Sequence, residues 1–556
     1  MRILTSHLGY NTAASKKAVI QLREAAPVEG ARLVGRGVAR ELAVGPEQAV
    51  DGWSAGTFRR VDFGHVRDEG EFRIEAGGVA SEPFVIGGRR VQHSTLSDVL
   101  YYFKAVRSSG EIDRKDRHAR FYGDDSGREV DARGGWLDAS GDHSKFLSHL
   151  NYTRMMNPQQ TPLCAWAFLA ARDHLPPQLA GPLGARMRDE GLYGADFLVR
   201  FQSPEGYFYT AVFDALTKDL DERVINAPLQ DSVRTTRWQA GYRQGAGLAI
   251  AALARAATAD DHGDFTAEDY LAAAVRGFDH LEEHNLSYLY DGTESVIDDY
   301  CALLAAAELA LAAPDARFAA AAVRRARSLA GRYTRAETGF GYLRGDAGGR
   351  PFFHAAEPGL PAIALMRFAE AVPGSPLAAE ARATALALLT DALHLTGEVN
   401  NPFGYARQYV QGDGEKPRTS FFYPHRNETG YWWQGENAGI CSTAYAAQLA
   451  AGLPECAPGL AERLRTLAED QLQWIMGLNP FDSSMIQGRG RNNVEYSTAF
   501  QNVPGGILNG VTSGFDDERD IAFMPEEHRT TGESWRWAEQ WIPHSAWFLL
   551  AVSAAR

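Results

Sequence analysis

The chain has few cysteines, and none of them stands in a metal-binding pattern. Its 556 residues include four cysteines, which are scattered along the chain at Cys164, Cys301, Cys441 and Cys456. No Cys-x-x-Cys pair occurs, which argues against a zinc knuckle and against a disulfide framework. We expect buried thiols and no cofactor, and the sequence leaves open whether a metal ion binds.

The chain also lacks an excess of positive charge. It has 56 lysines and arginines against 70 aspartates and glutamates, which gives a net charge of -14. Such a chain repels phosphate backbones and anionic membrane surfaces. Nucleic acid and membranes are therefore not expected partners. A homo-oligomer is compatible with the sequence, which does not fix the oligomeric state.

Long apolar runs are absent as well. Residues 1–7 lack the apolar run of about 7 to 15 residues that a secretory signal needs, which predicts a cytoplasmic protein. The most apolar stretch, 302–313, is interrupted by Glu308 and is shorter than the roughly 20 residues that cross a bilayer. We expect no transmembrane segment.

Two kinds of periodicity divide the chain. From residue 1 to about 88, short alternating runs such as 18–22 and 70–74 are separated by Gly, Pro and Asp, which predicts a small β-sandwich. After Gly87 and Gly88 the apolar spacing becomes helical. The boundary is expected near 86–93, with a β domain at 1–88 and a helical domain at 94–556.

The helical part is rich in alanine and leucine. Its first helix is marked by Leu96, Val99, Leu100 and Phe103, and further helices are expected at 159–172, 184–202, 242–258, 266–283, 296–313, 315–332, 358–371, 376–394, 434–452, 459–476 and 543–555. No repeat of fixed period occurs, which disfavours a solenoid of uniform units. A closed barrel of helical hairpins would instead collect its glycine-rich and aromatic loops at one mouth, where catalytic groups gather.

The most informative stretch is Gly134-Gly135-Trp136-Leu137-Asp138-Ala139-Ser140-Gly141-Asp142-His143-Ser144-Lys145-Phe146. Its two aspartates are four apart, about one helical turn, so at a loop-to-helix junction both carboxylates would face the same way and hold a water. Paired carboxylates beside Trp136 suggest sugar chemistry. The plainer alternative makes one aspartate an N-cap and the other an Asx turn.

This stretch resembles glycoside hydrolase family 9, whose corresponding segment reads Gly-Gly-Trp/Tyr-x-Asp-Ala-Gly-Asp-x-x-Lys, with Ser140 as an extra residue here. Residues 81–87 and 474–480 are also similar to family segments. The resemblance implies an N-terminal immunoglobulin-like β-sandwich followed by an all-α (α/α)6 barrel. It further implies that Asp142 is the general base and that Asp138 helps to hold the attacking water.

A glutamate near the end of the chain matches a second family segment. Residues 539–546 resemble Asn-Glu-x-x-Ile-x-x-Asn-Ala, which supplies the general acid, although Ala538 and Ser545 replace the asparagines. The resemblance implies that Glu539 is the acid, whereas a lone glutamate before a helix is usually a solvated charge. Neighbouring tryptophans can bury the carboxyl and raise its pKa, as an acid working near neutrality requires. They are Trp535, Trp537 and Trp541.

A third stretch, 423–437, alternates polar groups with aromatic rings. A pyranose needs both, because its faces stack on rings and its rim needs hydrogen bonds. The expected substrate-binding residues are His425, Asn427, Glu428, Tyr431, Trp432 and Trp433. Tyr431 and one of the two tryptophans should contact sugar, and Glu428 should lie near a ring substituent or pair with a substrate ammonium. The alternative is a helix-capping loop with a hydrophobic plug.

Other candidates are weaker. The acidic run 516–520 lacks the ligand spacing of an EF-hand and is expected to be a solvated loop rather than a calcium site. His149 and His544 are expected to pack or to support the site. Neither feature changes the predicted chemistry.

The segment after Gly488-Arg489-Gly490 departs from the endo-acting members of the family. Those members usually carry a histidine and arginine segment there, whereas this chain has Arg491-Asn492-Asn493. Together with Ser140, this departure resembles the exo-acting branch. The leading hypothesis is an inverting glycoside hydrolase that removes single glucosamine or glucose units from the non-reducing end of short β-1,4-linked oligosaccharides. The alternatives are an endo-β-1,4-glucanase and a catalytically inactive oligosaccharide-binding protein.

Overall fold

The first 87 residues form two β-sheets. The computed structural model describes residues 1–24, 27–35, 37–496 and 500–556. One sheet has the order β1-β3-β7-β6 and the other β2-β10-β8-β4-β5, with β9 on β8. The strands are β1 (Arg2–Leu4), β2 (Tyr10–Asn11), β3 (Lys17–Leu22), β4 (Ala31–Gly35), β5 (Val38–Leu42), β6 (Gln48–Ala49), β7 (Thr57–Asp62), β8 (Gly70–Ala76), β9 (Val79–Ala80) and β10 (Phe84–Gly87).

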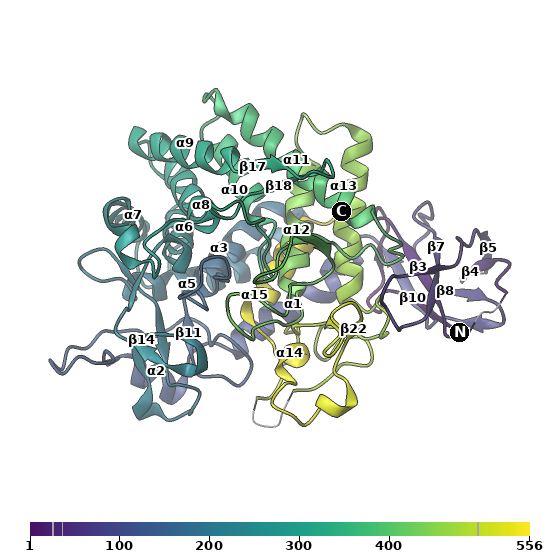
Figure 1. Ribbon diagram of the computed structural model, residues 1–556, viewed down its shortest axis with the longest axis horizontal. Coiled ribbons are helices and arrows are strands. Elements are labelled where there is room, and N and C mark those ends of the chain that lie inside the picture. Colours follow the sequence, from purple (N-terminus) through teal and green to yellow (C-terminus); the bar gives the residue numbers. More distant parts are fainter. Residues whose placement is uncertain (25–26, 36, 497–499) are drawn as a thin grey trace.

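The two sheets share one hydrophobic core. Ile20 and Val61 of one sheet lie in the same buried cluster as Ile74 and Ile86 of the other. On β8, buried and more exposed residues alternate from Glu71 to Ala76, which is the pattern of a strand with one face inward. This sheet-rich region is consistent with the predicted β-sandwich, and it lies at one side of the helical body in Figure 1.

Twelve helices of at least 11 residues occur in the described part of the chain. They are α1 (Arg90–Ala105), α3 (Thr161–Ala171), α5 (Pro182–Arg200), α6 (Ala246–Ala256), α7 (Ala267–Tyr288), α8 (Val296–Ala312), α9 (Ala316–Gly331), α10 (Leu360–Ala371), α11 (Leu377–Gly397), α12 (Asn437–Ala450), α13 (Pro458–Ile475) and α15 (Ile542–Ala554). All the helices predicted from the sequence are confirmed within a few residues. The short helices α2 (Gly110–Asp116), α4 (Pro177–Ala180) and α14 (Trp535–Ala538) were not predicted.

Six of the twelve helices close an inner ring. In order these are α3, α6, α8, α10, α12 and α15, and α15 packs back on α3. Helices α1, α5, α7, α9, α11 and α13 alternate with them along the chain and cover the ring from outside. Every residue of α3 and of α6 is buried, which explains why their sequences are apolar all round. This arrangement is an (α/α)6 barrel.

The inner helices give the barrel two distinct ends. We call the end formed by their N-termini the catalytic end, because the predicted site residues lie in the segments that lead into α3, α12 and α15. The other end, formed by their C-termini, is called the opposite end. Helix α8 shows how the sequence starts such a helix: the hydroxyl of Ser295 accepts a hydrogen bond from the amide of Ile297, and Asp298 completes a capping box.

A small sheet, built from β11 before α3 and from strands between α5 and α6, lies beside the catalytic end (Figure 1). It has the strand order β11-β13-β14-β15, and the separate pair β12-β16 adjoins it. The strands are β11 (Lys145–Phe146), β12 (Phe208–Tyr209), β13 (Ala211–Phe213), β14 (Val224–Pro228), β15 (Arg234–Thr235) and β16 (Gln239–Ala240). The sequence analysis did not predict this sheet.

The β-sheet region packs directly against the barrel. Lys17 of β3 forms a buried ion pair with Asp470 of α13, at 2.7 Å between Nζ and Oδ1. The ring of Trp53 packs at a tilt against the rings of Phe421 and Trp474 of the barrel. The division into domains at 1–88 and 94–556 stays a prediction.

Two expectations from composition can be compared with the structure. Cys164, Cys301 and Cys441 are buried free thiols, whereas Cys456 is partly exposed. Among the described residues, no helix combines the length and the apolar character needed to cross a bilayer.

Candidate active site

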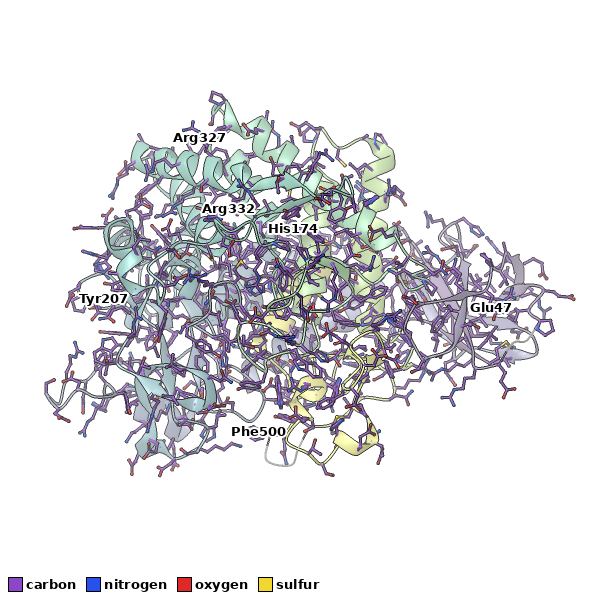
Figure 2. All side chains as sticks on the ribbon, viewed as in Figure 1. Glu47, His174, Tyr207, Arg327, Arg332 and Phe500 are labelled. Carbon is purple, nitrogen blue, oxygen red and sulfur yellow. The ribbon has the colours of Figure 1, made fainter. Side chains whose placement is uncertain are left out.

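Asp138 and Asp142 lie in a loop that leads into β11. The amide of Asp142 donates to the carbonyl of Ala139, and the amide of Asp138 donates to the carbonyl of Ser144. The expectation of a loop-to-helix junction is therefore wrong, because a turn followed by a strand brings the two carboxyls together. The turn requires glycine at Gly141, where φ is 75° and a Cβ would lie 2.6 Å from the Cα of Phe500. Phe500 is labelled in Figure 2.

Backbone hydrogen bonds fasten this loop to the segment that carries Glu539. The amide of Ser140 donates to the carbonyl of Gln540 at 2.9 Å, and the amide of Ile542 donates to the carbonyl of Asp138 at 3.0 Å. The hydroxyl of Ser140 accepts a further hydrogen bond from the amide of Gln540. Ser140, an extra residue in the sequence pattern, thus helps to join two segments about 400 residues apart.

The three predicted catalytic carboxyls line one small cavity of about 110 Å³. Aromatic rings form much of its wall, and the small sheet β11-β13-β14-β15 supplies one side. The lining residues are Asp138, Asp142, Phe146, His149, Leu150, Tyr152, Phe213, Leu216, Pro228, Leu229, Gln230, Asp231, Ser232, Tyr431, Trp432, Glu539 and Trp541. No lysine or arginine is among these described lining residues.

The cavity raises the pKa of two of these carboxyls. Burial, and then the negative charges of Asp142 and Glu539, raise the pKa of Asp138 well above its ordinary value. Burial raises the pKa of Glu539 to about 8, against a hydrogen bond from Asn509, and the charge of Asp142 adds to the rise. Asp142 is held differently, because its Oδ1 accepts hydrogen bonds from the amides of His143 and Ser144 and from the hydroxyl of Ser144.

His149 lies between the aspartates and the aromatic wall. Its ring stacks on Phe146 with 4.4 Å between the ring centres and lies 4.8 Å from the ring of Trp432. Its Nδ1 is 3.7 Å from Oδ2 of Asp138. Burial lowers the pKa of His149 to about 4, so the imidazole is neutral near pH 7.

Several buried polar atoms of the cavity have no hydrogen-bond partner within the described ranges. They are Oδ1 of Asp138, Nδ1 of His149, the hydroxyl of Tyr152 and Nε1 of Trp432. Buried polar groups in proteins are nearly always paired, so such a set indicates a place for a polar ligand. The hydroxyl groups of a sugar ring can donate to and accept from such atoms, and an aromatic side chain can pack against its face.

Comparison with known proteins shows the family to which the chain belongs. The family model described as glycosyl hydrolase family 9 matches residues 93–498, well over half of the chain. The chain belongs to glycosyl hydrolase family 9. It is a glycosidase, and the alternative of an inactive sugar-binding protein is not retained.

Solved structures share the whole fold with this family 9 hydrolase. A metagenome-derived family 9 endoglucanase has a TM-score of 0.68 at 20% identity over 100% of this chain and 99% of its own. A family 9 protein of Bacteroides ovatus has a TM-score of 0.68 at 17% identity over 99% and 98%. AaCel9A, solved with a cellobiose-like isofagomine, has a TM-score of 0.67 at 18% identity over 100% and 99%. The search of curated proteins gave no match.

Two of the six predicted substrate-binding residues line the hydrolase's cavity. Tyr431 is 38% exposed, so its ring stands at the cavity rim. Trp432 lies deeper, packed between His149 and Trp535. Tyr431 and Trp432 therefore lie at the cavity, and the expected contact of Tyr431 and one of the two tryptophans with sugar stays a prediction.

The other four predicted residues support the loop and do not line the cavity. Glu428 is occupied, since its two oxygens accept the amides of Arg154 and Met155. Asn427 is buried and ties the loop together, donating to the carbonyl of Trp432 and accepting from Thr429. His425 and Trp433 stack on each other with 3.6 Å between ring centres, away from the lining. The 423–437 stretch thus lines the cavity with two aromatic rings and uses its other side chains to hold the loop together.

Two other residues of the aspartate motif are structural. Trp136 is fully buried and donates its indole N–H to Glu190, so it does not stack on a ligand in the cavity. Lys145 is buried and forms an ion pair with Asp116 at 2.5 Å. The motif therefore places its aspartates by anchoring both flanks in the core.

Several lining residues were missed by the sequence analysis. Asp231 and Ser232 have left-handed backbones, with φ of 56° and 59°, although neither is glycine. Leu216 on the neighbouring turn also has a positive φ, 62°. The only available signal was the alternation in Phe208-Tyr209-Thr210-Ala211-Val212-Phe213, which indicates a strand but not where its turns lead.

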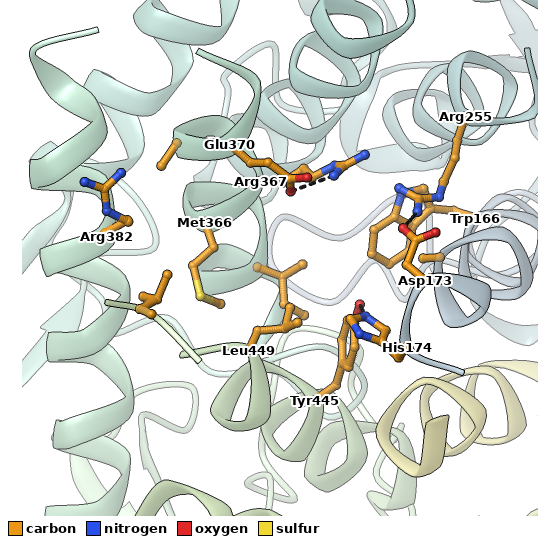
Figure 3. Close-up of a pocket in the computed structure, with 14 residues that line it drawn as sticks. Trp166, Asp173, His174, Arg255, Met366, Arg367, Glu370, Arg382, Tyr445 and Leu449 are labelled. Carbon is orange, nitrogen blue, oxygen red and sulfur yellow. Dashed lines mark hydrogen bonds and ion pairs between the residues drawn. The ribbon is translucent and has the colours of Figure 1, made fainter. Parts of the chain in front are cut away.

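A larger cavity, of about 390 Å³, lies at the opposite end of the barrel (Figure 3). Most of its charged side chains pair with one another, Arg255 with Asp173 and Arg367 with Glu370, and Arg382 pairs with Glu455. His174 and Tyr445 share a hydrogen bond of 2.9 Å on its wall. None of the predicted site residues lines it, so we do not assign the chemistry there.

No metal site is found among the residues that the structure describes. In the described part of the chain, no group of three or more His, Cys, Asp or Glu side chains is arranged to hold a metal ion. In the acidic run 516–520, Glu518 pairs with Arg418, and Oδ1 of Asp520 accepts the amide of Ser54. These partners explain the run as a joint between the barrel and the β-sheet region.

Proposed function

We propose that this hydrolase removes single glucosamine or glucose units from the non-reducing end of short β-1,4-linked oligosaccharides, with inversion at the anomeric carbon. The observation that carries the proposal is the convergence of Asp138, Asp142 and Glu539 in one small aromatic cavity. Asp142 takes a proton from water, Asp138 helps to hold that water, and Glu539 gives a proton to the departing oxygen.

The electrostatics support these roles. Three carboxyls in one buried cavity do not all ionise, because each charge disfavours the next. The raised pKa of Glu539, about 8, keeps it protonated near neutrality, as a general acid must be. The three donors on Asp142 balance a negative charge there, which suits the base.

The size of the cavity supports action at chain ends. About 110 Å³ is well below the range of about 300 to 1,000 Å³ that is usual for larger ligands. The turns at 214–218 and 229–233 contribute Leu216 and Asp231 to its wall. A short cavity closed by such turns suits one terminal sugar unit better than the middle of a long chain.

The charges of the lining support an amino sugar over a neutral one. Four carboxyls line the cavity without a lysine or arginine among the described lining residues. Asp231 forms no ion pair with any described residue, and it faces Tyr152 and Tyr431. Because Glu428 is occupied by backbone amides, we assign recognition of a substrate ammonium to Asp231 instead.

A second candidate function is internal cleavage of soluble β-1,4-glucans. It is favoured by one observation, that a similar structure is described as an endoglucanase and another was solved with a cellobiose-like compound. Product profiles separate the two. On oligomers of four to six units, glucan or deacetylated chitin, the proposal predicts monomers from the first minutes, whereas early release of mixed oligomers would favour the endoglucanase.

A further inference from the structure

Glu539 has one side-chain hydrogen-bond partner among the described residues. Nδ2 of Asn509 donates to Oε2 of Glu539 at 3.3 Å. The two residues are also tied through the backbone, because the amide of Asn509 donates to the carbonyl of Glu539 at 2.8 Å. Asn509 is fully buried, so its amide group stays beside the carboxyl.

His544 contacts the other side of the same amide. Nε2 of His544 lies 2.8 Å from Oδ1 of Asn509, and Nδ1 accepts the backbone amide of Ala438 at 2.7 Å. Since Nδ1 accepts a hydrogen bond, the neutral ring carries its proton on Nε2 and donates a hydrogen bond from there to Oδ1 of Asn509. Burial lowers the pKa of His544 to about 3, so the ring is neutral near pH 7.

The amide of Asn509 therefore has a fixed orientation. Its Oδ1 is used by His544, and its two N–H groups are shared among the carbonyl of Trp535 at 2.7 Å, Gln434 at 3.3 Å and Glu539 at 3.3 Å. If the amide turned over, Oδ1 would face Glu539 and accept the acidic proton. That proton would then be held away from the substrate.

We propose that Asn509 and His544 are positioning residues that keep the acidic proton of Glu539 on Oε1. His544 sets the orientation of the Asn509 amide, and Asn509 donates to Oε2, so only Oε1 carries the proton. This inference rests on the proposed role of Glu539 as general acid. The chain has Ala538 and Ser545 where the acid segment of the family usually has asparagines. The hydrogen bond to the carboxyl of Glu539 comes instead from Asn509, which lies on a separate loop.

The hydrogen bonds from His544 to Asn509 and from Asn509 to Glu539 are compatible with the bonds and protons that the reaction exchanges. The bond from the anomeric carbon to the departing oxygen breaks while a bond to the water oxygen forms. The proton on Oε1 of Glu539 moves to the departing oxygen, and Asp142 receives a proton from the water. The N–H of Asn509 then stabilises the new charge on Oε2. Hydrogen bonds in sites without substrate are often long, and this one at 3.3 Å is expected to shorten in the complex.

The test compares substrates whose leaving groups need a proton with substrates whose leaving groups do not. Variants Asn509→Asp, Asn509→Leu, His544→Phe and His544→Gln are assayed on the disaccharide that wild type hydrolyses and on the matching β-glycosyl fluoride. We expect kcat on the disaccharide to fall about 10-fold to 100-fold with little change in KM. The fluoride, which leaves without protonation, should lose far less, and His544→Gln, which keeps a donor, should regain part of the loss.

A second readout is the pH profile. Removing the Asn509 donor, or replacing it with a carboxylate, favours the protonated acid, so the basic limb of kcat should move to higher pH in both Asn509 variants. His174→Phe is the matched control, because it removes a buried histidine contact to Tyr445 at the opposite end of the barrel. It should change neither the ratio between the two substrates nor the basic limb.

The outcomes distinguish a failure of the positioning role of Asn509 and His544 from a failure of the proposed acid role of Glu539. If Glu539→Gln loses activity equally on both substrates, the proposed role of Glu539 as acid is wrong. If Glu539→Gln spares the fluoride but the Asn509 and His544 variants lose both substrates equally, or lose nothing, the positioning role is wrong. Thermal unfolding of each variant, and the isosteric Asn509→Asp change, guard against a loss caused by misfolding.

Discussion

At the opposite end of the barrel Glu308 is buried between two arginines, whereas at the catalytic end Glu539 is buried without any cation in the cavity lining that the structure describes. Glu308 bonds Arg255 at 3.2 Å and Arg367 at 2.8 Å, and it also accepts the indole N–H of Trp166. The two glutamates share burial inside one barrel but differ in their partners.

The difference shows in their pKa values. Burial by itself would raise the pKa of Glu308, but Arg255 and Arg367 outweigh it and the pKa is lowered. Burial raises the pKa of Glu539 to about 8, and no cation among the described residues opposes that rise. A buried carboxyl that is paired with arginines is ionised and stabilises the fold. A buried carboxyl without a cationic partner stays protonated and can donate a proton. The predictions below change one end at a time.

The largest effect is expected from removing the acid or the base. Glu539→Gln and Asp142→Asn should each lower kcat on the natural disaccharide by a factor on the order of 10² to 10⁴, the usual contribution of proton transfer. Steady-state kinetics measure this, with thermal unfolding as a check on folding. Wild-type activity in either variant would show that the comparison assigns the chemistry to the wrong end.

The matching change at the opposite end should act on stability. Glu308→Gln removes the buried counter-charge that Arg255 and Arg367 share and leaves them only Asp173 and Glu370, which are more exposed, so the free energy of unfolding should fall by about 1 to 3 kcal/mol. Denaturant unfolding of the two glutamate variants side by side measures the contrast. An unfolding free energy as low for Glu539→Gln as for Glu308→Gln would remove the distinction between the two ends.

The two carboxyls should also respond to pH in opposite directions. Because the pKa of Glu539 is raised in the folded state, its stabilising contribution is present below about pH 4.5 and is lost as the pH rises through about 8. The contribution of Glu308, whose pKa is lowered, is present above about pH 4.5 and is lost in acid. Glu539→Gln should therefore flatten the decline in stability towards pH 8, and kcat of the wild type should fall in the same range.

The smallest expected effect concerns substrate choice. Asp231→Asn should reduce kcat/KM for glucosaminides about 10-fold or more while leaving glucosides nearly unchanged, because only the ammonium loses a charged partner. Glu428→Gln is the matched control, since its oxygens bond backbone amides outside the cavity. Equal losses on both sugars in Asp231→Asn would reject the ammonium role.

The sequence allowed the barrel to be predicted because its helices carry local signals. Helices such as α6 and α8 are long alanine-rich runs with caps or glycines at their ends, and their bounds came within a few residues of 242–258 and 296–313. The β-strands at Lys17–Leu22 and Gly70–Ala76 followed from alternation in the same way. Such patterns depend on residues that are close in the sequence, so they can be recognised without knowing the fold.

The site was only partly predictable, because its geometry depends on distant contacts. Asp138, Asp142 and Glu539 could be named from motifs. The two segments that carry them are brought together by a backbone hydrogen bond from Ser140 to Gln540, which the sequence does not reveal. Asp231 reaches the cavity on a turn with a left-handed backbone at non-glycine residues, which local propensity does not predict. Glu428 and Trp433 have the right chemistry for sugar binding, yet loop packing uses them elsewhere.

The most direct test follows the first product of the wild-type enzyme by proton NMR. With a β-1,4-linked oligomer of four to six units as substrate, the account predicts that a single sugar in the α-anomeric form appears first and then mutarotates. A β-anomer as first product would contradict the inverting arrangement of Asp142 and Glu539. Oligomers released before any monomer would contradict action at the chain end.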